Sequence, residues 1–188
     1  MTTRWSASAE HPGLWVDPAQ DTRGTGIDLT DERATLVEYL RAYRLTMQMK
    51  CADLDAEQLA MRSVPPSTMS LLGLIRHMAE VERGWFRHVM AGEQVGHLYR
   101  VDGERDVDWD GAVADPELVE QAWTAWREEV AFAEQFTADA ADLGMLGRMT
   151  NGQDISLREV LVHMIEEYAR HCGHADLLRE RIDGRVGQ

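Results

Sequence analysis

The sequence has few cysteines and no long apolar run, and each scarcity excludes a class of protein. Cys51 and Cys172 are too few for a disulfide framework in a chain of 188 residues, so we expect buried, inert free thiols. No window approaches the roughly 18 consecutive apolar residues that a membrane span needs. The N-terminus lacks the apolar core of a signal peptide. We therefore expect a cytoplasmic protein.

Basic charge is also scarce. Lys and Arg together number 19 against 33 Asp and Glu, which gives a net charge of −14. A phosphate-binding surface needs clustered positive charge, so we expect no nucleic-acid partner. An anionic membrane surface would repel such a chain on average. No serine lies in a recognisable nucleophile turn and no glycine-rich phosphate loop follows a strand pattern, so nothing indicates a serine hydrolase or a nucleotide enzyme.

Helical periodicity is what the sequence has instead. Residues 1–29 are rich in Gly, Pro, Asp and Thr, and we expect an N-terminal arm anchored by Trp5 and Trp15. Apolar residues then recur with helical spacing in four segments. The first starts at a Thr30 cap and ends before the "SVPPST" stretch, and the other three cover about 69–90, 115–138 and 156–182.

No alternating pattern of strands competes with these helices. The segments therefore predict an all-α fold, a four-helix bundle over residues 30–184 with a short tail at 185–188. Two irregular links join the helices, at 93–115 and 141–154. The first link is longer than most connections in compact domains, which allows a crossover between the second and third helices.

Histidines are concentrated in the fourth predicted helix, "HMIEEYARHCGHADLLRE", residues 163–180. At roughly 100° per residue, Glu167, His171 and His174 lie within about 80° of His163 on one stripe. A carboxylate and an imidazole four residues apart can reach one point together. We therefore predict that Glu167 and His171 form one wall of a metal site, with His163 at its border. The alternative for Glu167 is an ion pair with an arginine.

A third ligand should come from a facing helix, as in other bundle metal sites. His77 is the best candidate, because it lies at the edge of the apolar face of the second helix, with small Gly84 one layer away. Its alternative is a hydrogen bond to a backbone carbonyl. A His-Glu-His set suits Zn(II), Ni(II) or Fe(II), and three protein ligands leave a coordination position open for reaction.

The stretches "SVPPSTMSLLGLIRHMAEVERGWF" and "HMIEEYARHCGHADLLRE" together resemble the DinB-like superfamily of four-helix metalloproteins. More narrowly, they resemble an actinobacterial branch near the mycothiol-dependent maleylpyruvate isomerases. The resemblance extends from about Asp31 to Gly184. It implies up-down-down-up helix order, mycothiol as a cosubstrate and a homodimer. It also implies a metal triad of one histidine from the second helix and an E-x3-H pair from the fourth.

Position by position, the resemblance implies His77, Glu167 and His171 as the metal ligands. Family members with an H-x3-H pair continue as H-R-G-Q, whereas this chain reads "HCGH". His174 stands where that glutamine would be. The departure leaves His174 as a group beside the metal or as a substrate contact.

Three functions are compatible with this pattern. The leading hypothesis is a metal-dependent thiol transferase or isomerase, in which a metal-activated low-molecular-weight thiol attacks a small electrophilic substrate. The second is a hydrolase that activates water, with Glu80 or His174 as the general base. The third is a non-enzymatic, stress-related binding or scaffold protein.

Overall fold

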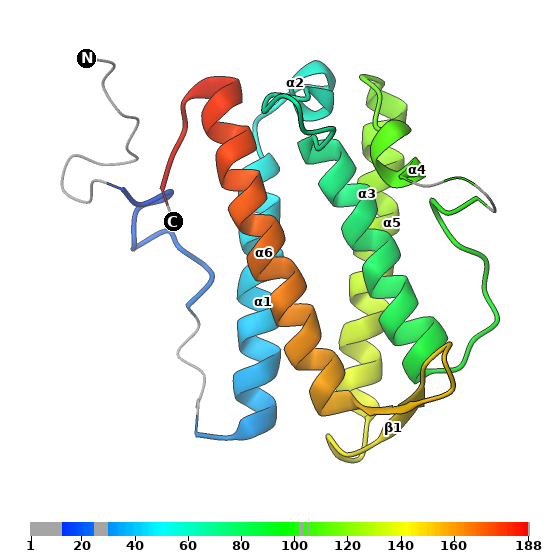
Figure 1. The fold of residues 1–188 in the computed structure, drawn as a ribbon. Helices are drawn as coiled ribbons and strands as arrows, with labels where there is room; N and C mark the ends of the chain where they lie inside the picture. Colours follow the sequence, from blue (N-terminus) through cyan, green and yellow to red (C-terminus); the bar gives the residue numbers. More distant parts are fainter. Residues whose placement is uncertain (1–12, 25–29, 102–103, 105, 188) are drawn as a thin grey trace.

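The computed structural model describes residues 13–24, 30–101, 104 and 106–187 (Figure 1). These residues form helices joined by loops, with one short hairpin. The elements are α1 (Glu32–Cys51), α2 (Ala56–Ala60), α3 (Leu71–Glu82), the π-helical segment η1 (Arg83–Met90), α4 (Val107–Asp110), α5 (Pro116–Asp139), β1 (Leu146–Arg148), β2 (Asp154–Ser156) and α6 (Leu157–Asp183). The predicted predominance of helix is confirmed. None of the described helices is long and apolar enough to cross a membrane.

Four long helical segments lie side by side: α1, α3 continued by η1, α5, and α6 (Figure 1). The chain ascends through α1 in that view, descends through α3 and η1, descends again through α5, and ascends through α6. α1 packs mainly against α6, and α3 packs mainly against α5. Because α3 and α5 run in the same direction, the link between η1 and α5 returns along the length of the molecule and carries α4 against α3.

The helix ends follow capping chemistry. Asp115 and Ser156 cap α5 and α6 as the sequence predicts, and Gly184 ends α6 with a φ of 78°. The predicted Thr30 cap is wrong by one residue. The side chain of Asp31 caps α1 by accepting a hydrogen bond of 2.8 Å from the backbone N–H of Ala34.

The sequence predicts four uninterrupted helices, and this prediction is wrong for the described residues. The first predicted segment divides, because Asp53 adopts a φ of 60° and Asp55 then caps the separate helix α2 with a capping box. The second changes from α-helix to π-helix after Glu82. The prediction that the chain forms no strands is also wrong. The link 141–154 contains β1 and leads into β2, and the two strands pair antiparallel with Leu146 opposite Ser156.

The N-terminal arm is attached by Trp15, which is buried as predicted. Its indole ring lies 4.1 Å from Lys50 Nζ and 4.1 Å from the guanidinium carbon of Arg185. Cations over an indole face are attracted by the ring quadrupole. The arm therefore packs where the end of α1 meets the C-terminal tail. Trp5, the other predicted anchor, lies outside the described residues.

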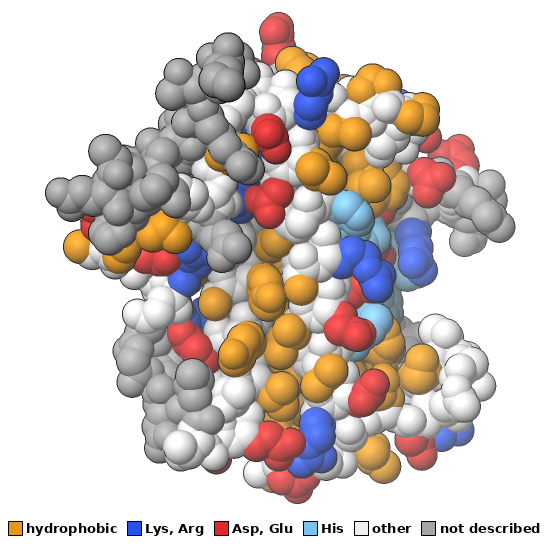
Figure 2. All heavy atoms as spheres, turned by 60° about the vertical axis from the view of Figure 1, so that its left-hand side comes forward, with side chains coloured by type: hydrophobic (Ala, Val, Ile, Leu, Met, Phe, Trp, Pro, Cys, Tyr) orange, Lys and Arg blue, Asp and Glu red, His pale blue; other side chains and the backbone are white. Residues whose placement is uncertain are grey.

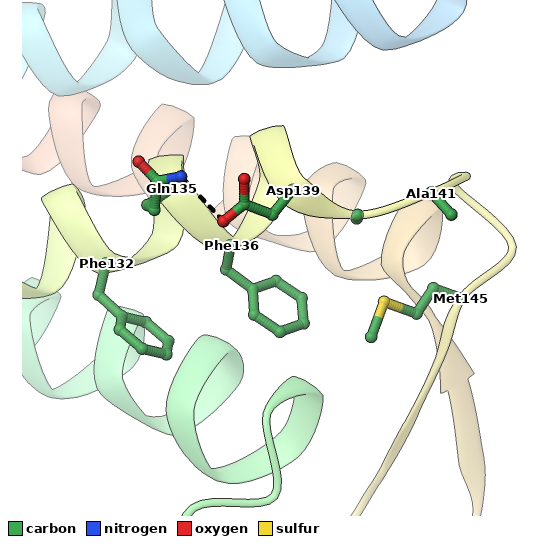
Figure 3. Close-up of a pocket in the computed structure, with 7 residues that line it drawn as sticks. Phe132, Gln135, Phe136, Asp139, Ala141 and Met145 are labelled. Atoms are coloured by element: carbon green, nitrogen blue, oxygen red, sulfur yellow. Dashed lines mark hydrogen bonds between the residues drawn. The ribbon is translucent and has the colours of Figure 1, made fainter.

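A pocket of about 420 Å³ opens where α5 meets the link to β1 (Figure 3). The rings of Phe132 and Phe136 point to the same side of α5, toward Met145. The side chain of Gln135 donates a hydrogen bond of 2.8 Å to Asp139. The lining holds no histidine or cysteine and a single carboxylate, so this pocket offers no set of metal ligands.

A buried polar network joins the four long segments. Glu82, which is fully buried, accepts two hydrogen bonds of 2.8 Å from the guanidinium of Arg44. The hydroxyl of Tyr168 donates a third, also at 2.8 Å, and itself accepts one from the indole of Trp126. Burial, and then the negative charge of Glu82, raise the pKa of Tyr168 well above its ordinary value, so the hydroxyl keeps the proton that it donates.

Replacing Glu82 with Gln should destabilise the protein, because Arg44 would lose its buried counter-charge and its other partner, Glu134, is exposed and lies 3.6 Å away. Removing one partner of a buried ion pair costs about 3–5 kcal/mol. Adding Arg44→Met should restore part of this loss, since the unpaired charge is then gone. Urea denaturation measures the free energy of unfolding. The control Glu32→Gln, which breaks an exposed pair with Arg158, should leave the midpoint unchanged. Equal losses of unfolding free energy in Glu82→Gln and Glu32→Gln would contradict this account.

Candidate metal centre

Three predicted ligands converge between α3 and α6. His77 comes from α3, and Glu167 and His171 come from α6, one helical turn apart. One ligand atom of each lies within 4.8 Å of the others. His171 Nε2 and Glu167 Oε2 are 3.4 Å apart. A tetrahedral ion with bonds of about 2.1 Å separates its ligands by about 3.4 Å, so the carboxylate and imidazole of α6 already have the spacing of such a site.

The Nδ1 atoms of His77 and His171 are both engaged by side chains outside the triad. His77 Nδ1 lies 2.8 Å from Asp108 Oδ2. His171 Nδ1 lies 3.3 Å from Nδ1 of His174. Histidine ligands in metal sites commonly bind with one ring nitrogen while the other is held by a hydrogen bond. The two Nε2 atoms are therefore the ones available to an ion.

Burial makes His171 a neutral ligand. Burial, followed by the nearby positive charges of His77 and His174, lowers the pKa of His171 from 6.5 to about 4. An imidazole must be unprotonated to bind a metal, and His171 meets that condition at neutral pH without any rearrangement. Among the three ligands it is also the most buried. The donor chemistry of the triad therefore fits a divalent transition metal.

The remaining histidines of the fourth predicted helix border this centre. His163 Nε2 lies 3.5 Å from Glu167 Oε1, and its ring packs on Trp85 at 4.6 Å between centroids. Histidine side chains gather in one strip of the surface, with hydrophobic side chains beside it (Figure 2). A methyl group at Gly84 would meet nothing within 4 Å, so the space expected beside this glycine is present.

Glu80 binds the start of the link that follows η1. Its Oε1 lies 2.6 Å from His97 Nδ1, and its Oε2 accepts hydrogen bonds from the backbone N–H groups of Leu98 and Tyr99. The carboxylate is buried, and both oxygens are occupied. Of the two candidates for a general base, His174 contacts a ligand of the triad, whereas Glu80 contacts the link.

Asp108 and Trp109, both beside the triad, were missed by sequence reasoning. Both lie in the short helix α4, whose four residues show no apolar period. The indole of Trp109 stacks on the ring of His77 at 5.0 Å between centroids, with an interplanar angle of 26°. The acidic run "DVDWD" is the one signal that could have indicated them, but chain order does not reveal that it packs against α3.

The two cysteines are free and buried, as predicted. Burial raises the pKa of each thiol to about 12. A thiol with such a pKa is protonated at neutral pH and is a poor nucleophile. Any thiolate chemistry at this centre would therefore need a thiol from outside the chain.

Acidification should destabilise the metal-free protein through His171. Its pKa is about 4 when folded and 6.5 ordinarily, so between these values the unfolded chain binds a proton that the folded chain does not. Stability is therefore lost as the pH falls from 6.5 toward 4. Chemical denaturation of wild type and His171→Gln at pH 7 and at pH 4.5 measures the effect. The wild type should lose more stability than the variant, and equal losses would contradict the assigned pKa.

Two comparisons with known proteins find relatives of this chain. The family model described as mycothiol-S-transferase, a DinB-like family, matches residues 35–184. A solved structure described as a conserved protein from Enterococcus faecalis is similar over 86% of this chain and 100% of its own, with 14% identity and a TM-score of 0.52, which shows a shared fold. No curated protein matches the sequence significantly. Since the family model covers both ligand-bearing helices and most of the chain, the protein belongs to the mycothiol S-transferase family.

Proposed function

We propose that this protein is a metal-dependent thiol transferase or isomerase built on an up-down-down-up four-helix bundle. The observation that carries the proposal is the convergence of His77, Glu167 and His171 from two helices onto one point. Family membership supports mycothiol as the thiol. The substrate would be a small electrophile. We also propose, from the resemblance, that the protein is a cytoplasmic homodimer.

A divalent ion (Zn, Ni or Fe) held by the triad would lower the pKa of a thiol at its open position, so that the nucleophilic thiolate exists at neutral pH. The chain itself holds the three ligands in place. Burial keeps His171 neutral, and Asp108 and His174 hold the outer nitrogens of the two imidazoles. In the transfer reaction a carbon–sulfur bond forms, the bond to the leaving group breaks, and the thiol proton leaves with that group or with solvent.

His174 is the candidate proton acceptor that we favour for the thiol. It lies beside His171 and is partly buried, whereas both oxygens of Glu80 already accept hydrogen bonds. The same comparison leaves His174, and not Glu80, as the candidate base of the hydrolase alternative. His174 can serve as the base in thiol transfer or in hydrolysis, so turnover with a thiol must distinguish the two reactions.

A pocket of about 540 Å³ adjoins the triad and would receive the polar part of the thiol. It extends from His77 along the link, and Tyr99 and Arg100 contribute to its lining. The guanidinium of Arg76 lies 4.0 Å from the Tyr99 ring centroid, which holds this aromatic wall against α3. Hydroxyl and guanidinium groups can hydrogen-bond a polar thiol such as mycothiol.

Metal content is the first test of this function. Purified wild type supplied with Zn(II), Ni(II) or Fe(II) should hold about one ion per chain, since the triad is a single three-ligand site. His171→Ala should lose it, because a two-ligand remnant binds weakly. Elemental analysis measures the content. His97→Gln is the matched control, because this histidine is outside the triad and should leave the metal content unchanged. Retention of metal by His171→Ala would contradict the site.

Thiol consumption is the second test. Metal-loaded wild type incubated with mycothiol and a panel of electrophiles should consume the thiol, and His171→Ala should be at least about 100-fold slower, the loss expected when an activating group is removed. Free thiol is followed with a colorimetric reagent. Metal binding without consumption of thiol from any electrophile would favour the hydrolase or scaffold alternatives.

A further inference from the structure

We propose that Asp108 is a positioning residue for the metal centre, and that it makes α4 part of that centre although α4 supplies no ligand. The proposal rests on the proposed function, because it concerns how His77 is presented to the ion. Neither the sequence pattern nor the family match assigns a role to Asp108. It lies in the link between η1 and α5, 31 residues after His77.

The contact between Asp108 and His77 has the geometry of a charge-assisted hydrogen bond. The separation of Nδ1 and Oδ2 is 2.8 Å, and the Asp108 side chain is 17% exposed. A carboxylate can only accept, so the proton lies on Nδ1 of His77. Asp108 thus selects the tautomer whose Nε2 lone pair is free for an ion.

Three further contacts hold Asp108 where it can do this. The guanidinium of Arg76, next to His77 in α3, donates to the backbone carbonyls of Asp108 and Val107 at 2.8 and 3.0 Å. The indole of Trp109 stacks on His77. A methyl group at Gly73 would lie 2.7 Å from Cε3 of Trp109, so α4 approaches α3 closely enough to require glycine there. The face of α3 that carries Gly73, Arg76 and His77 therefore receives α4 in a defined position.

Metal binding and the docking of α4 should consequently be coupled. Withdrawal of electron density through Nε2 makes the Nδ1–H group a stronger donor, which strengthens its bond to Asp108. Coupling of this kind is reciprocal, so whatever Asp108 contributes to metal affinity, the metal contributes to the retention of α4. The link that walls the polar pocket would thus be held more firmly in the loaded protein.

Zinc affinity of the full chain tests the proposal. Competition with a chromophoric chelator should show Zn(II) binding to Asp108→Ala weakened by about 10–100-fold, the range found when such supporting partners are removed. Asp108→Asn keeps an acceptor but loses the charge, so its zinc affinity should lie between those of wild type and Asp108→Ala. Asp110→Ala is the matched control, because Asp110 is in the same helix, 64% exposed and paired with Arg62. Its affinity should equal that of wild type.

The tautomer of His77 gives a readout that needs no metal. Nitrogen-15 NMR of the metal-free wild type should show the Nδ1–H form, and Asp108→Ala should shift His77 toward the Nε2–H form. Amide hydrogen exchange in residues 107–110 should slow when zinc is added to wild type, and should slow less in Asp108→Ala. Wild-type zinc affinity and an unchanged tautomer in Asp108→Ala would overturn this proposal alone. A wild type that binds no zinc would overturn the proposed function as well.

Gly73→Ala tests the same contact between α3 and α4 by a change in α3. The added methyl group would displace Trp109 and shift α4 while leaving the carboxylate of Asp108 in the chain. We expect weaker zinc binding and faster amide exchange in α4. Gly84→Ala, whose methyl group would enter open space, should bind zinc as wild type does. Equal affinities in the two variants would contradict the steric role of Gly73.

Discussion

The arrangement of the helices depends on the hydrogen bonds that the buried carboxylate of Glu82 accepts. It accepts hydrogen bonds from Arg44 of α1 and Tyr168 of α6, and Tyr168 in turn connects Trp126 of α5. A charge in the interior is tolerated only when it is paired and fully hydrogen-bonded, so the four segments must meet in one register to satisfy it.

The same network fixes the relative position of the two helices that carry the candidate metal ligands. Glu82 follows His77 by five residues in the chain, in the same continuous helical segment, and Tyr168 directly follows Glu167. The hydrogen bond between Glu82 and Tyr168 therefore relates the two ligand-bearing helices close to the point where their ligands converge. A ligand set formed by two helices needs such a constraint, because an error of an ångström in their relative position disrupts coordination geometry.

The link between η1 and α5 is hydrogen-bonded to α3 beside the site. Glu80 binds its start through His97, Leu98 and Tyr99, and the contact between His77 and Asp108 binds its end. Both attachments use carboxylates and both are made to α3. The long segments thus carry the candidate ligands, while the link contacts one of them, His77, and lines the polar pocket. This division follows from the parallel course of α3 and α5, which requires a connection long enough to pass over the site.

The sequence by itself determined the helical character, the capped starts of α5 and α6, and the three candidate ligand side chains that converge. Period and capping residues are local signals, and Glu167 and His171 share a helix, so their proximity follows from spacing alone. Tertiary structure decided what depends on distant contacts: the division at Asp53, the π-helical turn after Glu82, the hairpin of β1 and β2, and the position of Asp108 beside His77. Asp108 has no periodic pattern around it, and 31 residues separate it from its partner. Only the packing of α4 on α3 brings the two side chains together, because chain order carries no information about which loop residue meets which helix face.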